Sequence, residues 1–380
     1  SPYCGGFCHL TLLGARLVHQ GPGQAPAIDI RRGHVYLRDI QTSGYSRSLL
    51  DHGRPLNAEQ ISEYISVHGR RPSERLNVAL TIGNAPKRSL GLPVKPTPEI
   101  PQHIWDSLDR YTIVDHTKLK NGRLTISVPT PWVIVDPSGN PDTADDAPLL
   151  QAALDCGAPY VGLLNTGAFL LRKPVVINGR GKRNVQLVYG LMTDLIAGDE
   201  IIDMDVQPDI ARRLVFRIET GKVPILFIKG IRCHSSNPRG KEYQFFLNNA
   251  AHTVVFEDIR CKRNTRGYRN GPTARGQDVF FENVEFACNH PRNDELMVFD
   301  HQQVWARQFN LEQVINNPQR NGTVAANLVS HGGTLWVFGQ KMGEFHGVFL
   351  KVTGGSRTEM LSVFFNQGRQ DHGVPGATNF

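Results

Sequence analysis

The sequence VVFEDIRC at residues 254–261 contains the pattern that decides the fold. Apolar residues alternate with others on both sides of Glu257-Asp258, but at these two residues the alternation slips by one position. In a straight strand such a slip would turn half of the apolar side chains outward, so the chain must bend there. The same slip falls in two similar stretches, at Lys229-Gly230 and at Glu282-Asn283.

The pattern recurs along residues 223–365, and successive copies begin 28, 25, 24, 31 and 24 residues apart. A unit of strand and turn this small cannot bury its own apolar face, so repetition at this period is typical of a solenoid. Because the units are strands, we predict an all-β fold, a parallel β-helix. The copies are IKGIRC from Ile228, FEDIRC from Phe256, FENVEF from Phe281, WARQFN from Trp305, WVFGQK from Trp336 and MLSVFF from Met360.

The chain is predicted to have three parts. Residues 1–56 contain two further copies, LLGARL from Leu12 and LRDIQT from Leu37, and are interpreted as the terminal coils of a first β-helix. Residues 57–102 are predicted to form a short helix and a proline-rich strap. Residues 103–380 are predicted to form a second β-helix with a capping helix at its N-terminal end.

The short helix is predicted over residues 58–67, because Ile61, Tyr64 and Ile65 share one helical face and Asn57 is a suitable N-cap. The strap follows, and its segment LPVKPTPEIP (residues 92–101) predicts a stiff, extended chain at the domain boundary.

The capping helix is predicted within residues 136–157. Thr143 and Asp146 have capping-box spacing, Leu150 and Leu154 lie on one apolar face, and Gly157 ends the helix. A helix at this point would cover the open end of the solenoid core. Short strands are predicted to follow it at Val161–Leu164, Phe169–Leu171, Val175–Ile177 and Val185–Tyr189.

Composition limits the class of protein. The chain has 380 residues, of which 40% are hydrophobic and 20% charged, as in ordinary globular proteins. No apolar run approaches the roughly 18 residues of a membrane span, so none is expected. The net charge of +7 favours polyanionic partners or a solvated basic exterior, and no nucleic-acid-binding module is recognised. The chain opens SPYCGGFCHL, already close to strand pattern, and we interpret it as processed or incomplete.

The six cysteines favour no metal or disulfide framework. Cys4 and Cys8 lack a second ligand pair at zinc-finger spacing, so no metal and no cofactor are expected. Cys233 and Cys261 occupy the same repeat position, and Cys288 falls near it one coil later. We interpret these three as stacked, inward-facing small apolar side chains.

Several stretches resemble a known family. DTADDAPLLQAALDCGAPYVGL from Asp142 and PVVINGRGKRNVQLVYG from Pro174 resemble the entry to a pectate-lyase-superfamily β-helix. QQVWARQFNLE from Gln302, HGGTLWVFGQK from His331 and PKRSLGLPVKPTPEIP from Pro86 are similar to family 55 glycoside hydrolases. The resemblance covers residues 10–50 and 85–365. It implies two right-handed parallel β-helices, a secreted or cell-surface location, and inverting exo-β-1,3-glucanase activity with a glutamic acid as proton donor.

The candidate catalytic residues are carboxylates near the repeat. Inverting hydrolysis needs two carboxyl groups about 6.5–9.5 Å apart, and successive coils lie about 4.8 Å apart. Glu285 and Glu312 are 27 residues apart, near one coil, and Asp300 precedes the strand that contains Glu312. These three form the predicted catalytic group. Glu257 and Glu282 share an equivalent position at the bend, where a solvated role is the alternative.

The candidate substrate-binding residues are basic or aromatic. Arg307 is interpreted either as a bidentate clamp for a sugar hydroxyl or carboxylate or as a support for the backbone carbonyls of a neighbouring coil. Arg263, Arg266 and Tyr268 lie in a predicted protruding loop at residues 261–277, which would contact an acidic polysaccharide or simply be solvated. Trp305 and Trp336 are predicted to stack in the core.

Three functions remain in competition. The first is an extracytoplasmic glycoside hydrolase acting on β-glucan through a carboxylic acid pair. The second is a non-catalytic structural, adhesive or filament-forming β-helix, which leaves self-association open. The third is a lyase or hydrolase of acidic polysaccharide. The His-Gly at His331 is similar to that of polygalacturonases, but the paired aspartates of that family are missing, and this assignment is rejected.

Overall fold

The computed structural model describes residues 9–21, 24–31, 34–68, 75–82, 89–137, 145–179, 183–198, 213–235, 243–262, 265–290, 295–315, 326–342 and 348–365. The chain divides into two compact units, Ser1–Pro93 and Val94–Phe380. The division falls inside the strap.

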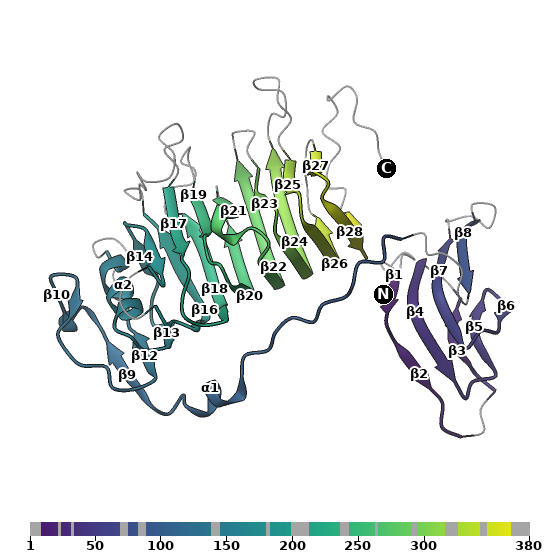
Figure 1. Cartoon of the computed structure of the whole chain (residues 1–380), viewed down its shortest axis with the longest axis horizontal. Helices are drawn as coiled ribbons and strands as arrows, with labels where there is room; N and C mark the ends of the chain where they lie inside the picture. Colours follow the sequence, from purple (N-terminus) through teal and green to yellow (C-terminus); the bar gives the residue numbers. More distant parts are fainter. Residues whose placement is uncertain are drawn as a thin grey trace. The chain divides into compact units, whose positions relative to one another are not determined.

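The second unit is a parallel β-helix, as predicted. From β16 onward its strands alternate between a 12-stranded and a seven-stranded sheet, and every neighbouring pair in these two sheets is parallel (Figure 1). One long strand and one short strand therefore make each coil.

The 12-stranded sheet contains β9 (Tyr111–Val114), β12 (Trp132–Val135), β13 (Tyr160–Leu163), β14 (Phe169–Leu171), β16 (Leu187–Ala197), β18 (Ile225–Ser235), β20 (Thr253–Lys262), β22 (Asp278–His290), β24 (Gln303–Ile315), β26 (Thr334–Met342), β28 (Arg357–Leu361) and β29 (Phe364–Phe365). The seven-stranded sheet contains β15 (Val175–Ile177), β17 (Arg213–Ile218), β19 (Tyr243–Asn248), β21 (Thr265–Asn270), β23 (Met297–Asp300), β25 (Ala326–His331) and β27 (Val348–Thr353). A short hairpin joins β10 (Leu119–Lys120) and β11 (Arg123–Leu124).

The predicted bends are confirmed, and each lies at a residue with positive φ. Asp258 has φ 55°, Asn283 has φ 52° and Gly230 has φ 72°. At residue 230 the backbones approach so closely that a Cβ would lie 1.9 Å from the Gly190 carbonyl oxygen, which only glycine avoids. Asn283 Nδ2 donates to Asp258 Oδ1 at 2.7 Å, so neighbouring bends are also joined by their side chains.

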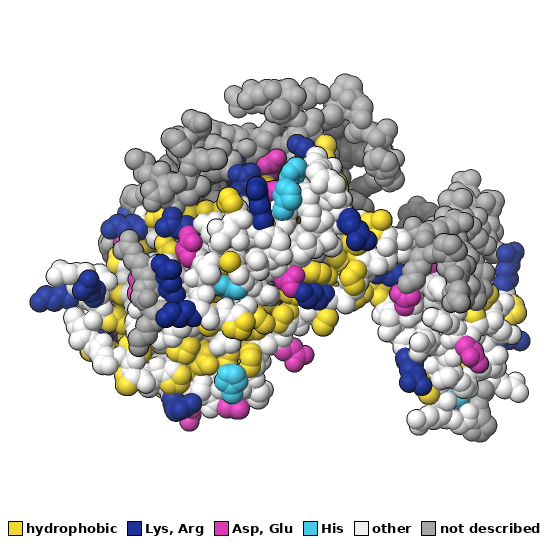
Figure 2. Space-filling model, in the orientation of Figure 1, with side chains coloured by type: hydrophobic (Ala, Val, Ile, Leu, Met, Phe, Trp, Pro, Cys, Tyr) yellow, Lys and Arg dark blue, Asp and Glu magenta, His cyan; other side chains and the backbone are white. Residues whose placement is uncertain are grey.

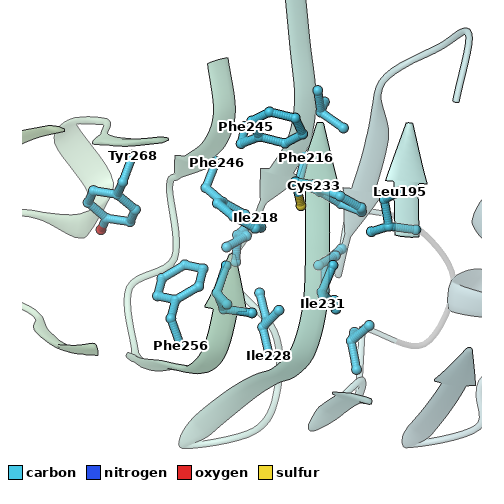
Figure 3. Close-up of a cluster of buried hydrophobic side chains, with 14 of the residues drawn as sticks. Leu195, Phe216, Ile218, Ile228, Ile231, Cys233, Phe245, Phe246, Phe256 and Tyr268 are labelled. Carbon is cyan, nitrogen blue, oxygen red and sulfur yellow. The ribbon is translucent and has the colours of Figure 1, made fainter. Parts of the chain in front are cut away.

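The core of the β-helix is a stack of equivalent side chains from successive coils (Figure 3). Phe256 stacks on Phe281 with ring centroids 5.1 Å apart, because the two residues pair in register. Cys233 and Cys261 also pair in register and are buried, as predicted. Cys288 falls two residues beyond their row, opposite Gln313.

Trp305 and Trp336 pair in register, but they lie on the outer face of the sheet and not in the core, where they were predicted. Phe281 pairs with Ala306, not with Trp305, so the repeat slips by one residue in this coil. A slip of one residue moves a side chain to the opposite face. Trp305 and Trp336 therefore lie on the outer face, where Trp305 stacks on Phe280 with ring centroids 5.4 Å apart.

The strap covers this outer aromatic row, which explains why Trp305 is only 6% exposed and Trp336 only 1%. It is extended, as predicted, and Lys95 lies 4.8 Å from the centre of the Trp305 ring. Farther along, Trp105 of α1 (Gln102–Asp106) packs against Trp132 and Tyr189.

The predicted capping helix is confirmed as α2 (Ala147–Asp155). It packs on the first coils, and its buried face includes Leu150 and Leu154. Asp146 is fully buried ahead of the helix, where it binds His116 at 2.7 Å and accepts from the backbone N–H of Leu170. This carboxylate therefore supports the cap, while Thr143 lies outside the described residues.

The first unit contains both parallel strand pairs, as in successive coils of a β-helix, and antiparallel pairs. Leu12 of β1 (His9–Leu13) pairs with Leu37 of β4 (His34–Ser43), in the register that the two repeat copies predict. Strand β2 (Arg16–Val18) also pairs with β4, and β3 (Pro26–Ile30) pairs in parallel with β5 (Arg47–Asp51). Strand β6 (Arg54–Leu56) turns back on β5.

The predicted helix over 58–67 is wrong, since this segment forms β7 (Gln60–His68) between β4 and β8 (Arg75–Ile82) in antiparallel pairing. Ile61 and Glu63 are fully buried, and Tyr36 donates to the Glu63 carboxylate. Pairing on both sides therefore overrides the helical spacing of the isoleucines. Among the described residues, no helix has the length and apolar character needed to cross a membrane.

Candidate functional site

Two of the three predicted catalytic carboxylates lie on one face of the 12-stranded sheet. Glu285 of β22 pairs with Asn310 of β24, and Glu312 lies two residues farther along β24. Their inward neighbours Phe286 and Leu311 belong to the core, so both glutamates point outward. One coil across and two residues along corresponds to about 8 Å between their backbone positions, inside the range for inverting hydrolysis.

Basic side chains surround this pair. Arg260 Nε lies 2.5 Å from Glu285 Oε2, and Lys262 Nζ lies 3.7 Å from Glu285 Oε1. Lys341 Nζ donates to Glu312 Oε1 at 2.8 Å. Figure 2 shows the same intermixing of basic and acidic side chains on the visible face of the β-helical unit. The region is therefore a ladder of alternating charge.

The environment of Glu312 favours its ionised form. Burial acts to raise the pKa of this carboxyl, but hydrogen bonds from Lys341 and Asn310 and the charges of Lys341 and Lys262 outweigh it, so the pKa is lowered. A carboxylate that stays ionised is suited to act as a general base.

Asp300, the third predicted catalytic residue, lies on the other sheet, away from Glu285 and Glu312. It ends β23 in the seven-stranded sheet, where Arg275 donates twice to its Oδ2 and His301 Nδ1 lies 2.7 Å from its Oδ1. Burial acts to raise the pKa of Asp300, but the bonds and charges of Arg275 and His301 lower it overall. The predicted group of three is therefore divided between two sheets.

Asp300 instead belongs to a cluster that the sequence did not predict. His331 pairs with Asp300 one coil away, and its ring centroid lies 5.0 Å from that of His301. One possible ligand atom from each of the three residues lies within 4.8 Å of the others. The available signal was a histidine directly after a strand in two successive coils, 30 residues apart.

Arg307 supports the strap. Its Nη1 donates to Thr97 Oγ1 at 2.8 Å and its Nη2 to the Lys95 carbonyl, while its guanidinium lies 5.0 Å from the Trp336 ring centre. These contacts are with the strap and not with the carbonyls of a neighbouring coil. Thr97 also donates to Glu282, whose pKa is raised mainly by burial.

The predicted protruding loop at residues 261–277 is largely strand. Residues 265–270 form β21, in which Arg266 is 5% exposed and Tyr268 is fully buried. The Tyr268 hydroxyl donates to Gln302 Oε1 and accepts from Asn248 Nδ2. Buried side chains cannot bind a polysaccharide, so these two residues leave the candidate set, and Arg263 lies outside the described residues.

Comparison with known proteins assigns the chain to no family. No family model matches the chain, and no curated protein matches it.

Proposed function

We propose that this chain is an extracytoplasmic carbohydrate-active protein that hydrolyses β-glucan with inversion, using Glu285 and Glu312. The observation that supports the proposal most is the diagonal register of the two glutamates on one outward face. Their side chains are 22% and 32% exposed, so a bound glycan can reach both.

In this mechanism Glu312 is the general base. Its lowered pKa keeps it ionised, and it removes a proton from the water that attacks the anomeric carbon. Glu285 is the general acid: once substrate displaces Arg260, it takes up a proton from solvent and gives it to the leaving glycosidic oxygen. Because Arg260 lies against the Glu285 carboxylate, substrate binding must displace this side chain, which is 41% exposed.

The choice of β-glucan rests on the resemblance to family 55 glycoside hydrolases. The alternative substrate is an acidic polysaccharide, which the surrounding Arg260, Lys262 and Lys341 would attract. The two substrates differ in charge, so the salt dependence of binding separates them.

The first test measures release of reducing sugar from laminarin and from pectate. We expect activity on laminarin that falls at least about 100-fold in both Glu285→Gln and Glu312→Gln. Glu219→Gln is the control. The Glu219 side chain is similarly exposed, at 33%, and is paired with an arginine, but it directly follows β17 of the seven-stranded sheet. Activity that survives both substitutions would exclude this pair.

The stereochemistry of the product is a second, independent test. Backbone positions about 8 Å apart leave room for a water molecule between the two carboxyl groups and predict an inverted anomeric configuration. Proton NMR of the first product formed from laminarin measures this directly, and a retained configuration would contradict the mechanism.

The second candidate function is a non-catalytic structural rod. The observation that favours it is that both glutamates form ion pairs within their own ladder, which a purely structural charge ladder would also show. In that case no glycan is cleaved, and sedimentation analysis is expected to show concentration-dependent association of the chain.

A further inference from the structure

We propose that His301 and His331 bind one divalent transition-metal ion, such as Zn²⁺ or Ni²⁺, with Asp300 as the carboxylate that orients the His301 ring. The three residues come from two successive coils, and one ligand atom of each lies within 4.8 Å of the others. Both imidazoles are exposed, so a metal ion can reach them from solvent. This inference does not depend on the hydrolase proposal, which uses the other sheet.

The hydrogen bonds of the two rings are the first argument. His301 Nδ1 is bonded to Asp300 Oδ1 at 2.7 Å, and His331 Nδ1 is bonded to Thr353 Oγ1 at 2.9 Å. Among the described residues nothing is bonded to the Nε2 atom of either ring. Metal-binding histidines typically use one ring nitrogen for a carboxylate, carbonyl or other oxygen, which fixes the orientation and keeps the second nitrogen for the metal.

The close approach of two glycines to the rings is the second argument. A Cβ on Gly332 would lie 2.6 Å from His301 Cδ2, and a Cβ on Gly354 would lie 2.6 Å from His331 Cε1. Both glycines have positive φ, 58° and 63°. The backbone therefore packs directly against each imidazole and limits its rotation, so the site is formed before the ion binds.

The position of Arg275 determines the class of metal. Arg275 donates to Asp300 Oδ2 through both Nε and Nη2, so the charge of the only carboxylate in the cluster is already largely compensated. Ca²⁺ and Mg²⁺ prefer several charged oxygen ligands, whereas Zn²⁺, Ni²⁺ and Cu²⁺ bind well to imidazole. The cluster should therefore select transition metals over Ca²⁺ and Mg²⁺.

The test is isothermal titration calorimetry of the full chain, without a histidine tag, against ZnCl₂, NiCl₂ and CaCl₂. We expect binding of Zn²⁺ and Ni²⁺ that weakens by at least about tenfold in both His301→Gln and His331→Gln, and no resolved binding of Ca²⁺. Thr353→Val removes only the orienting hydroxyl and should weaken binding by about tenfold.

The matched control is His52→Gln. His52 forms the same bond to a preceding aspartate, with Nδ1 and Asp51 Oδ1 2.7 Å apart, but it belongs to no metal-ligand group among the described residues. Circular dichroism of each variant confirms that it is folded. Absence of Zn²⁺ binding by the folded native chain, or equal affinity in the native chain and both cluster variants, would overturn the proposal.

Discussion

Two Asp-His pairs in this chain share their local geometry but not their surroundings. Asp51-His52 and Asp300-His301 both end a strand, and in both the ring Nδ1 lies 2.7 Å from the preceding carboxylate. The histidines have φ values of 49° and 53°, so the backbone turns in the same left-handed way. In both pairs the histidine is therefore placed against the aspartate by a left-handed residue directly after a strand.

The neighbouring strands decide what each pair does. Asp51 is 7% exposed and accepts from Tyr64 and Ser66 of β7, so it joins two strands inside the first unit. Asp300 is paired with an exposed arginine and lies beside His331 of the next coil. One pair is consequently a structural link, and the other has the donors for a metal ion.

The largest expected effect is on stability, from Asp51→Ala. Loss of this carboxylate removes one acceptor from the buried Ser66 hydroxyl and from the half-buried Tyr64 hydroxyl, and a buried group that loses its acceptor costs about 1–3 kcal/mol. Asp300→Ala should cost less than about 1 kcal/mol, because its ion pair is largely at the surface. Urea denaturation of both variants measures the difference, and equal losses would remove the distinction between the two pairs.

A smaller effect is expected at the glycines that follow His52 and His331. Gly53→Ala meets nothing within 4 Å and should cost only the left-handed backbone penalty, about 1 kcal/mol. Gly332→Ala adds the same penalty but also pushes against the His301 ring. Zn²⁺ affinity should therefore fall about tenfold in Gly332→Ala alone, and calorimetry of the two variants tests this prediction.

The smallest expected effect is the pH dependence that Asp300 contributes. Its pKa is lower in the folded chain than the ordinary value of 3.8, so its stabilisation is complete at pH values above that value. As the pH falls through the folded pKa, this stabilisation is lost. The native chain and Asp300→Asn should therefore differ in unfolding free energy near neutral pH and converge in acid. A difference that grows on acidification would contradict this sign.

The fold could be predicted because the apolar pattern reports the bends directly. The slips at Gly230, Asp258 and Asn283 each correspond to a residue with positive φ. Prediction failed where two periods overlap: Ile61 and Ile65 fit a helix, and only pairing with β4 and β8 makes the segment a strand. It also failed at Trp305, where the repeat shifts by one residue and the strap, not the core, covers the indole.

The candidate sites were harder to predict, because coil length varies. Glu285 and Glu312 are 27 residues apart, near one coil, but Glu285 pairs with Asn310 and Glu312 lies two residues farther along β24. Tyr268 was placed in a loop because TRGYRN is polar, although Tyr268 is buried. His301 and His331 come together only because the strands β23 and β25 pair, and no local signal reports that register.

The strap sets a length that the number of coils must match. Lys95 lies at β24 and Trp105 at β12, and six steps between neighbouring strands separate these two strands, about 29 Å. The chain from Lys95 through the first turn of α1 can extend about 28–31 Å, so it covers this distance with little slack. Insertion or loss of one coil would change the required span by about 4.8 Å. Coil number and strap length can therefore change only together, and the length of the strap limits the number of coils between β24 and β12.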